Sequence, residues 1–319
     1  MNVAKIGSLE VSAQGFGAMG LSHVYGQADE AESIRTLHRA IDLGVTFFDT
    51  ATGYGNGHNE DLLGRAIAGR RDELVIASKF THGQGGEGRK VSAREAVEAS
   101  LRRLNVDRID LYYLHRVDPE VPVTESVGQL AQLRDEGKIG GVGLSEASAS
   151  QLRAAHGETP ITALQSEYSL WTRDVEAEIL PLTRELGIGF VAYSPLGRGF
   201  LAGAGPVEDN DRRRIHPRFQ DEAVAANARR RVTIEGVAER LGVTPAQVSL
   251  AWVLSKGVVP IPGTRHIRHL EDNWAAGTIS LDDETVAELE AAFPRGATVG
   301  DRYPAEQMAF VPAAEPALS

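Results

Sequence analysis

Short apolar runs alternate with amphipathic stretches along most of the chain. The runs at 74–77 and 109–114 are almost continuously apolar, as expected for strands that are buried on both faces of a sheet. The same pattern predicts eight strands, at residues 15–19, 45–49, 74–79, 109–115, 140–145, 161–165, 188–194 and 258–262. An opening segment at 4–13 predicts a small hairpin ahead of them.

Helical patterns fill the intervals between these strands. The helix expected at 29–43 begins with a capping Asp29 and ends before Gly44, and the helix at 92–104 begins with a capping box of Ser92 and Glu95. Further helices are expected at residues 59–67, 123–136, 147–155, 175–186, 245–255, 267–276 and 282–292. A β-α alternation at spacings of roughly 30 residues implies parallel crossovers, as in a doubly wound sheet or a barrel. Eight units favour a (β/α)8 TIM barrel, with a core at about 5–292 in a single domain spanning 1–319.

Two segments depart from the regular alternation. About 65 residues separate the seventh strand from the eighth, where about 25 would suffice, and the surplus at 197–241 includes a charged helix near 221–241. A long insertion after a barrel strand predicts a substrate lid, although a surface insertion without a chemical role fits the same pattern. After residue 292 the periodicity fades and prolines recur, so 293–319 is expected to form an irregular tail.

Composition and charge exclude several classes of function. Lys and Arg number 33 against 44 Asp and Glu, and a formal net charge of −11 repels phosphate backbones and anionic lipids, so neither nucleic acid nor a membrane is expected as a partner. No apolar run reaches the roughly 18 residues of a membrane span, and the N-terminus lacks a secretory pattern, so a cytoplasmic location is expected. The chain has no cysteine and no pair of histidines at metal-ligand spacing with a carboxylate, so no metal is expected. Arginine clusters at 212–214 and 229–231 are expected on solvated faces.

Polar side chains follow the predicted strands at the ends that converge on one mouth of a barrel. Asp49, Lys79 and His115 end strands, and Tyr54 lies in the glycine-rich loop after Asp49. A free phenol keeps its proton up to about pH 10, and lowering its pKa by about 2–3 units requires roughly 3–4 kcal/mol from a nearby cation. We therefore expect Lys79 to lower the pKa of Tyr54, Asp49 to keep Lys79 charged, and His115 to orient a substrate oxygen, as a general acid for carbonyl reduction requires. Taken singly, these residues could also be a turn cap, a snorkelling lysine, a rim-packing tyrosine and a core histidine.

Several longer motifs carry a resemblance to a known family. In chain order they are GVTFFDTA at 44–51, NEDLLG at 59–64, ASK at 77–79, IDLYYLH at 109–115, YSPLGRG at 193–199 and IPGTR at 261–265. By these motifs the chain resembles the aldo-keto reductases, and it is similar to the group that includes the pyridoxal-reductase-like and perakine-reductase-like enzymes.

The resemblance implies a barrel with NADPH or NADP+ across its C-terminal face and a small-molecule carbonyl substrate. It assigns Tyr54 as proton donor, Asp49 and Lys79 as its tuning pair, and His115 as the group that orients the carbonyl. The residues it implies for the cofactor are Ser145 and Gln165 at the carboxamide, Tyr193 against the ring, Ser194, Leu196 and Arg198 near the pyrophosphate, Gly263, Thr264 and Arg265 at the 2′-phosphate, His269 late in the same segment, and Asp272 and Asn273 near the adenine.

A hydroxyl, backbone amides at a helix start and an arginine fork suit a dianionic phosphate, so NADPH is expected to be preferred over NADH. Two positions depart from the family pattern. Glu146 stands where many members have Asn, and His269 stands where many have a second Arg, with Arg268 one residue away.

Other functions stay open at this point. The barrel also resembles the β subunits of potassium channels, which would make the protein an NADPH-binding redox sensor or a partner-binding subunit. A Schiff-base barrel with Lys79 as nucleophile requires a low lysine pKa, which Asp49 would raise. Met19, Tyr25 and Trp171 are expected either to form a pocket for a moderately apolar carbonyl compound or to be barrel packing, and the oligomeric state is left open.

Overall fold

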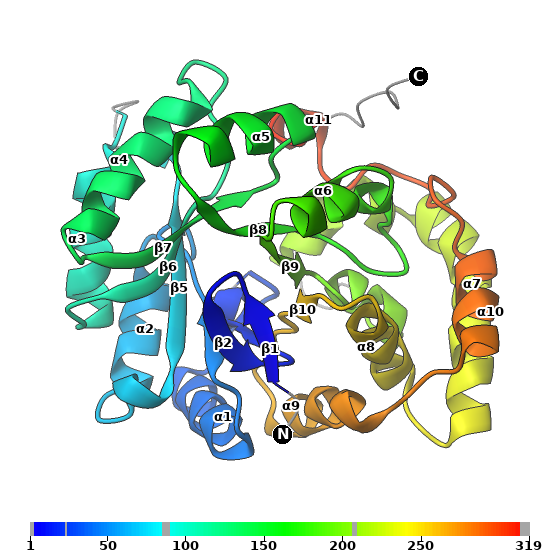
Figure 1. The fold of residues 1–319 in the computed structure, drawn as a ribbon. Helices are drawn as coiled ribbons and strands as arrows, with labels where there is room; N and C mark the ends of the chain where they lie inside the picture. Colours follow the sequence, from blue (N-terminus) through cyan, green and yellow to red (C-terminus); the bar gives the residue numbers. More distant parts are fainter. Residues whose placement is uncertain (1–2, 23, 85–89, 206–208, 313–319) are drawn as a thin grey trace.

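The eight predicted strands form one parallel sheet in a computed structural model that describes residues 3–22, 24–84, 90–205 and 209–312 (Figure 1). Successive strands along the chain are neighbours throughout the sheet, in the order β10-β9-β8-β7-β6-β5-β4-β3. Their bounds are β3 Phe16–Gly17, β4 Phe47–Asp49, β5 Val75–Phe80, β6 Ile109–Leu114, β7 Ile139–Ser145, β8 Ile161–Glu167, β9 Gly189–Tyr193 and β10 Val259–Pro260.

Backbone hydrogen bonds between the first and last strands close this sheet into a barrel. The Gly15 amide donates to the Pro260 carbonyl at 2.9 Å, and the Gly17 amide donates to the Pro262 carbonyl at 3.2 Å. The closure depends on small residues, because a Cβ on Gly263 would lie 2.2 Å from the carbonyl oxygen of Gly17. The predicted (β/α)8 fold is thus confirmed.

A two-stranded hairpin covers one end of the barrel. Its strands, β1 (Val3–Ile6) and β2 (Leu9–Ser12), pair antiparallel, and Figure 1 shows them in front of the barrel. Ile6 and Val11 are buried in one cluster with barrel residues such as Phe47. The hairpin predicted at 4–13 therefore continues the barrel core.

Helices surround the strands, and a side chain caps the start of four of them. The surrounding helices are α1 Glu30–Leu43, α2 His58–Ala66, α3 Ala93–Leu104, α4 Val123–Asp135, α5 Ala149–Glu158, α6 Ile179–Glu185, α8 Pro245–Ser255 and α9 Ile267–Ala275. The four with a capped start are α1, α3, α5 and α8. The Asp29 side chain accepts from the Glu32 amide at 2.8 Å, and the capping box of Ser92 and Glu95 is formed. Helix α6 begins later than expected because Pro181, which has no amide hydrogen, fits only in a first turn.

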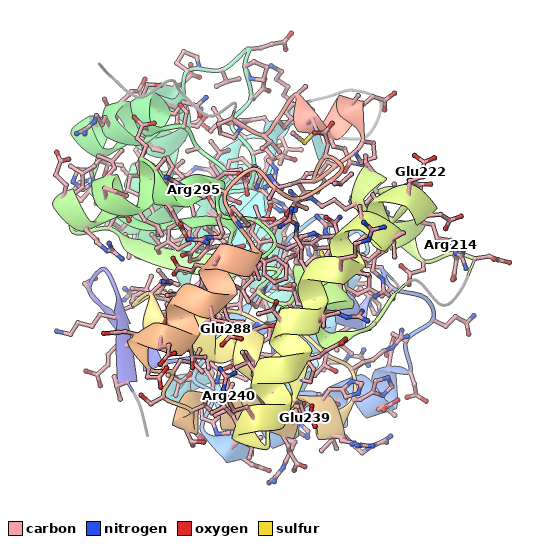
Figure 2. The ribbon with its side chains drawn as sticks, turned by 90° about the vertical axis from the view of Figure 1, so that its right-hand side faces the viewer. Arg214, Glu222, Glu239, Arg240, Glu288 and Arg295 are labelled. Atoms are coloured by element: carbon pink, nitrogen blue, oxygen red, sulfur yellow. The ribbon has the colours of Figure 1, made fainter. Side chains whose placement is uncertain are left out.

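Outside the barrel, the insertion packs against the helix that precedes the tail and against the tail itself, where the Val299 amide donates to Asn227 Oδ1 at 3.0 Å. Helix α7 (Asp221–Leu241) runs beside α10 (Asp283–Ala292), and Arg240 and Glu288 form an ion pair between them at 2.7 Å (Figure 2). The described part of the tail includes a short helix, α11 (Ala305–Met308). Arg302, just before it, is buried at the mouth of the barrel, so the tail is less irregular than predicted.

Candidate active site

A buried ion pair lies at the mouth of the barrel. Asp49 ends β4 and Lys79 lies in the adjacent strand β5. The Lys79 ammonium donates to Asp49 Oδ1 and, at 2.8 Å, to the carbonyl oxygen of Thr50. Gln165, in β8, donates through Nε2 to the second Asp49 oxygen at 2.8 Å. Protein groups, rather than water, therefore compensate both charges.

Tyr54 and His115 complete this cluster. Tyr54 lies in the loop after β4, and His115 directly follows β6. The Lys79 Nζ atom is 5.2 Å from the centroid of the Tyr54 ring. The rings of Tyr54 and His115 have centroids 5.8 Å apart and planes at 83°. The structure thus brings together the side chains expected at one mouth, and their individual roles stay predictions.

The pKa of Tyr54 differs in direction from the expectation. Burial, followed by the nearby Asp49 carboxylate, raises the pKa of the Tyr54 phenol well above its usual range, against the opposite effect of Arg116 and Arg198. The net lowering that the sequence predicted is therefore not found, because the lost hydration of a buried phenolate and the Asp49 carboxylate outweigh the cations around Tyr54. Tyr54 therefore holds its proton at neutral pH.

Burial also shifts the two basic groups of the cluster. It lowers the pKa of His115 well below its usual range, and Arg116 and Lys79 act in the same direction, so the imidazole is neutral at pH 7. Burial lowers the pKa of Lys79 as well, although Asp49 opposes the shift. The expected raising effect of Asp49 on Lys79 is therefore present but outweighed by loss of hydration.

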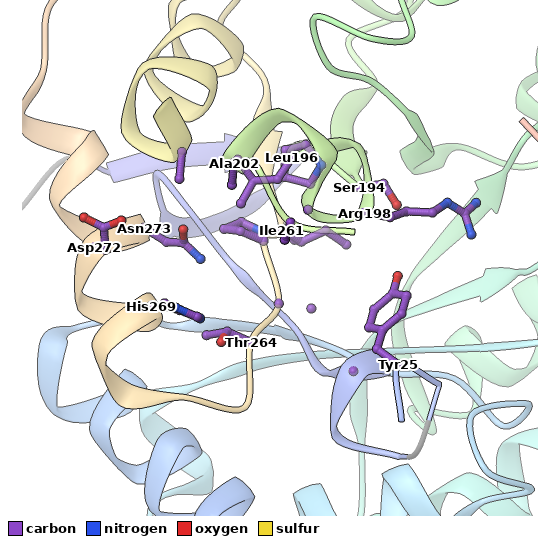
Figure 3. A pocket seen from close by; sticks show the side chains of 18 of the residues that line it. Tyr25, Ser194, Leu196, Arg198, Ala202, Ile261, Thr264, His269, Asp272 and Asn273 are labelled. Atoms are coloured by element: carbon purple, nitrogen blue, oxygen red, sulfur yellow. The ribbon is translucent and has the colours of Figure 1, made fainter. Parts of the chain in front are cut away.

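A cavity of about 1020 Å³ adjoins this cluster, at the upper end of the roughly 300–1,000 Å³ of ligand sites. It lies between the 3₁₀ segment η6 (Gly197–Ala202) and α9 (Figure 3). Asp49 and Tyr54 belong to its lining. The residues implied for the cofactor that line it are Gln165, Tyr193, Ser194, Leu196, Arg198, Gly263, Thr264, Arg265, His269, Asp272 and Asn273. Ser145, the remaining member of that set, borders a smaller cavity next to His115.

Unusual backbone conformations concentrate at this mouth. Glu146, Ser194 and Arg198 have positive φ values of 51°, 50° and 56°. The other non-glycine residues of this kind in the described ranges are Asn56 and Asn105, and asparagine tolerates the conformation. Backbone strain of this kind is typical of functional sites, and here it turns the chain at the ends of β7 and β9.

Helix α9 begins at the edge of the large cavity. The side chain of its N-cap residue, His266, accepts no hydrogen bond from the backbone amides of the first turn, so these amides lack a side-chain acceptor. Arg265 donates to the carbonyl oxygens of Gln27 and, at 3.2 Å, Tyr25, and so holds the segment before α1. Arg268 is exposed, lines the cavity and has no hydrogen-bond or ion-pair partner within the described ranges. An anion here would meet free amides and the Arg268 guanidinium.

The tail brings to the mouth a hydrogen-bond network that was not predicted from the sequence. Arg302 donates to both oxygens of Glu146 at 3.0 and 3.2 Å, and the Tyr193 hydroxyl donates to Glu146 at 2.8 Å. The Tyr303 hydroxyl lies 2.8 Å from that of Tyr193, and the Arg198 guanidinium lies 4.7 Å from the centroid of the Tyr303 ring. One residue in the sequence could have pointed to this network. Glu146 is a carboxylate at a position where many family members have Asn, and a buried carboxylate requires a cation from another part of the chain.

The expected aromatic lining is only partly present. Met19 and Tyr25 line the large cavity. Trp171 is buried and stacks on Phe200, with ring centroids 4.1 Å apart, and it does not belong to the lining. Of the two interpretations of Trp171, barrel packing is therefore the correct one.

The arginine cluster at 212–214 was predicted to lie on a solvated face, but one of its members is buried. Arg213 is buried and forms an ion pair with Asp211 at 2.6 Å. Its guanidinium lies 5.1 Å from the centroid of the Tyr25 ring, because this part of the insertion folds back toward the cavity. The insertion thus contributes side chains to the site.

Metal and membrane features are lacking over residues 3–22, 24–84, 90–205 and 209–312. Within these ranges no group of three or more His, Asp or Glu side chains is placed to hold a metal ion. No helix there is long and apolar enough to span a bilayer.

Comparisons with known proteins agree with this architecture and these motifs. The model of the Aldo/keto reductase family matches residues 14–293. A probable aldo-keto reductase from Glycine max is 48% identical over 307 residues, which cover 92% of this chain and 89% of the relative. The chain belongs to the aldo-keto reductase family.

Solved structures of similar proteins share the fold over nearly the whole chain. An aldo/keto reductase from Klebsiella pneumoniae, in complex with NADP and acetate, is 29% identical with a TM-score of 0.76, covering 95% of this chain and 98% of that one. A glycerol dehydrogenase from Gluconobacter oxydans is 28% identical with a TM-score of 0.79, covering 92% of this chain and 95% of that one.

Proposed function

We propose that this protein reduces aldehydes or ketones to alcohols with NADPH, and that Tyr54 is the proton donor. The observation that carries the proposal is the buried pair of Asp49 and Lys79 beside Tyr54 and His115, next to a cavity of about 1020 Å³. Family membership and the NADP in the related Klebsiella pneumoniae structure support it.

The large cavity has the chemistry that a phosphorylated dinucleotide requires. At one side, the uncapped start of α9 and the free Arg268 offer hydrogen-bond donors and positive charge to a phosphate. Tyr193, at the end of β9, lines the same cavity close to the catalytic cluster, where its ring can cover a planar heterocycle. When bound there, NADPH supplies a hydride to the carbonyl carbon.

Tyr54 is protonated at rest, which suits a group that donates only when the substrate oxygen becomes negative. An alkoxide is a stronger base than a phenolate, so the proton moves from Tyr54 to the oxygen. The Lys79 ammonium, 5.2 Å from the ring centroid, then faces a new negative charge on Tyr54. This attraction is absent before the reaction, so it favours the transition state over the bound substrate. The neutral His115 can donate an N–H to the same oxygen.

Steady-state turnover with a panel of aromatic aldehydes and diketones tests the proposal. Tyr54→Phe is expected to lower kcat by about 10²- to 10⁴-fold, the usual contribution of a positioned general acid. Its affinity for NADPH, followed by fluorescence titration, should stay close to wild type. Tyr112→Phe is the matched control, because Tyr112 is a buried tyrosine of β6 that contacts Ser100 at 2.9 Å and lines neither cavity.

The same measurements separate the alternatives. Tight NADPH binding without oxidation by any carbonyl compound would contradict the reductase and favour a redox sensor or a partner-binding subunit. Covalent trapping of a carbonyl compound by borohydride at Lys79 would indicate Schiff-base chemistry. We expect no trapping, because Lys79 is fully buried, is bonded to Asp49 and Thr50, and lines neither cavity.

A further inference from the structure

The smaller cavity next to the catalytic cluster has a cationic lining. Its volume is about 180 Å³, and Tyr54 and His115 border it. Its arginines are Arg116, Arg198 and Arg212, and within the described ranges no aspartate or glutamate belongs to its lining. The large cavity shares Arg198 but does not include Arg116 or Arg212.

Arg116 and Arg212 are the arginines of this cavity that form no ion pair within the described ranges, and of the two Arg116 is the half-buried one, whereas Arg212 is exposed. The Arg116 Nη1 atom donates to the carbonyl oxygen of His115 at 2.6 Å and to Ser145 Oγ at 3.1 Å. Its Nη2 atom lies 3.5 Å from the Tyr303 hydroxyl. All three acceptors are uncharged, and within the described ranges Arg116 forms no ion pair. The guanidinium therefore keeps N–H donors for a further acceptor, and it stays charged because arginine does not lose its proton in proteins.

The carboxylates of the mouth are engaged by other cations. Asp49 binds Lys79, and Glu146 binds Arg302. Glu167 lies 3.4 Å from Arg218 and 3.6 Å from Arg198. No described carboxylate of the mouth is therefore within ion-pair distance of Arg116, although Glu146 attracts its charge from further away and the chain as a whole carries a net charge of −11. A charge held in a cavity without a partner is costly unless a ligand supplies the opposite charge.

We infer that the physiological substrate is a small carbonyl compound that carries a carboxylate, with the carbonyl at Tyr54 and the carboxylate on Arg116. This inference rests on the proposed reductase function. The volume of about 180 Å³ favours a short chain between the two groups. The exposed Arg212 at the same cavity adds positive charge that attracts such an anion. This substrate class differs from the moderately apolar carbonyl compound that the aromatic residues suggested.

Matched substrates test this specificity in the wild-type protein. We compare 4-oxobutanoate with its methyl ester and with butanal, each at saturating NADPH. Reduction gives the hydroxy acid as the aldehyde carbon gains a hydride and its oxygen a proton, while NADPH becomes NADP+. The expected kcat/KM for 4-oxobutanoate exceeds that for the ester by about 10- to 100-fold, in line with the strength of hydrogen bonds between charged groups.

Variants assign the preference to one side chain. Arg116→Gln is expected to reduce the ratio of kcat/KM between anion and ester to near one, and Arg116→Lys to retain part of it. Arg153→Gln removes one exposed charge from α5, outside both cavities, and should leave the ratio unchanged. The substrate comparison within the wild-type protein does not depend on how well the variants fold.

Distinct results would overturn the inference. Equal kcat/KM for anion and ester in the wild-type protein would refute it and leave the reductase function standing. A weaker NADPH affinity of Arg116→Gln with an unchanged ratio would assign the guanidinium to a cofactor phosphate instead. Absence of reduction with every carbonyl compound would refute the proposed function itself.

Discussion

The substitution Arg302→Met tests whether the tail is held at the mouth by a buried charge pair. Arg302 and Glu146 are 8% and 4% exposed, and two hydrogen bonds of 3.0 and 3.2 Å join them. Methionine keeps much of the volume of the arginine stem but leaves the Glu146 carboxylate without its cation. The remaining donors to that carboxylate are the Tyr193 hydroxyl at 2.8 Å and the Glu167 amide at 2.9 Å.

The expected loss of stability follows from the free energy needed to bury a charge without its partner. Removing one partner of a buried pair costs about 3–5 kcal/mol, and the two remaining donors place this case near 3 kcal/mol. For a chain of this length the corresponding fall in Tm is about 6 °C, at roughly 2 °C per kcal/mol. Arg302→Met combined with Glu146→Gln removes both charges, so the double variant should recover at least about 2 kcal/mol of the loss.

Urea unfolding of the wild type, both single variants and the double variant gives the required free energies. Limited proteolysis of the same proteins reports on the tail, which should be cut faster in Arg302→Met. The reasoning is refuted if Arg302→Met loses less than about 1 kcal/mol, or if the double variant is no more stable than Arg302→Met.

Three further predictions concern other parts of the molecule. Burial and, after it, the charge of Arg198 lower the pKa of His216 to about 4. The unfolded chain therefore binds a proton near pH 6.5 that the folded protein does not bind, and the free energy of unfolding should fall by about 2 kcal/mol between pH 7 and 5. In urea unfolding, His216→Asn should reduce this pH dependence, and an equally steep dependence would contradict the assignment to His216. In thermal unfolding, Gly263→Ala should destabilise the barrel by several kcal/mol. Gly236→Ala lies in the middle of α7, where a Cβ meets no neighbouring atom, and should stabilise the protein by about 1 kcal/mol. Equal changes in stability for the two variants would argue against the close contact of Gly263 with Gly17. Arg268→Gln should weaken binding of NADPH about 10-fold and of NADH much less in calorimetry, and equal weakening would remove Arg268 from the phosphate site.

Local patterns in the sequence predicted most of the fold. Asp29 and Ser92 mark helix starts because their side chains cap the first amides, and this depends on neighbouring residues alone. The strand-end residues Asp49, Lys79 and His115 could be placed together because parallel strands bring their C-terminal ends to one mouth.

Other features depend on contacts between distant residues and could not be predicted. Arg302 binds Glu146, which lies 156 residues earlier in the chain. The tail that carries Arg302 is interrupted by prolines and shows no periodic pattern from which this contact could be predicted. The raised pKa of Tyr54 reflects burial, which is a property of packing rather than of residue type. Arg116 was overlooked beside His115, because only the structure reveals that it lacks a carboxylate partner.

Single-turnover stopped-flow mixing is the most direct test of the central claim, that Tyr54 protonates a carbonyl oxygen during reduction. NADPH-loaded wild-type protein and Tyr54→Phe are mixed with the same carbonyl compound, and cofactor absorbance is followed through one turnover. We expect rapid oxidation in the wild type and a rate at least about 100-fold lower in Tyr54→Phe at equal NADPH occupancy. Equal rates in the two proteins would contradict the role of Tyr54.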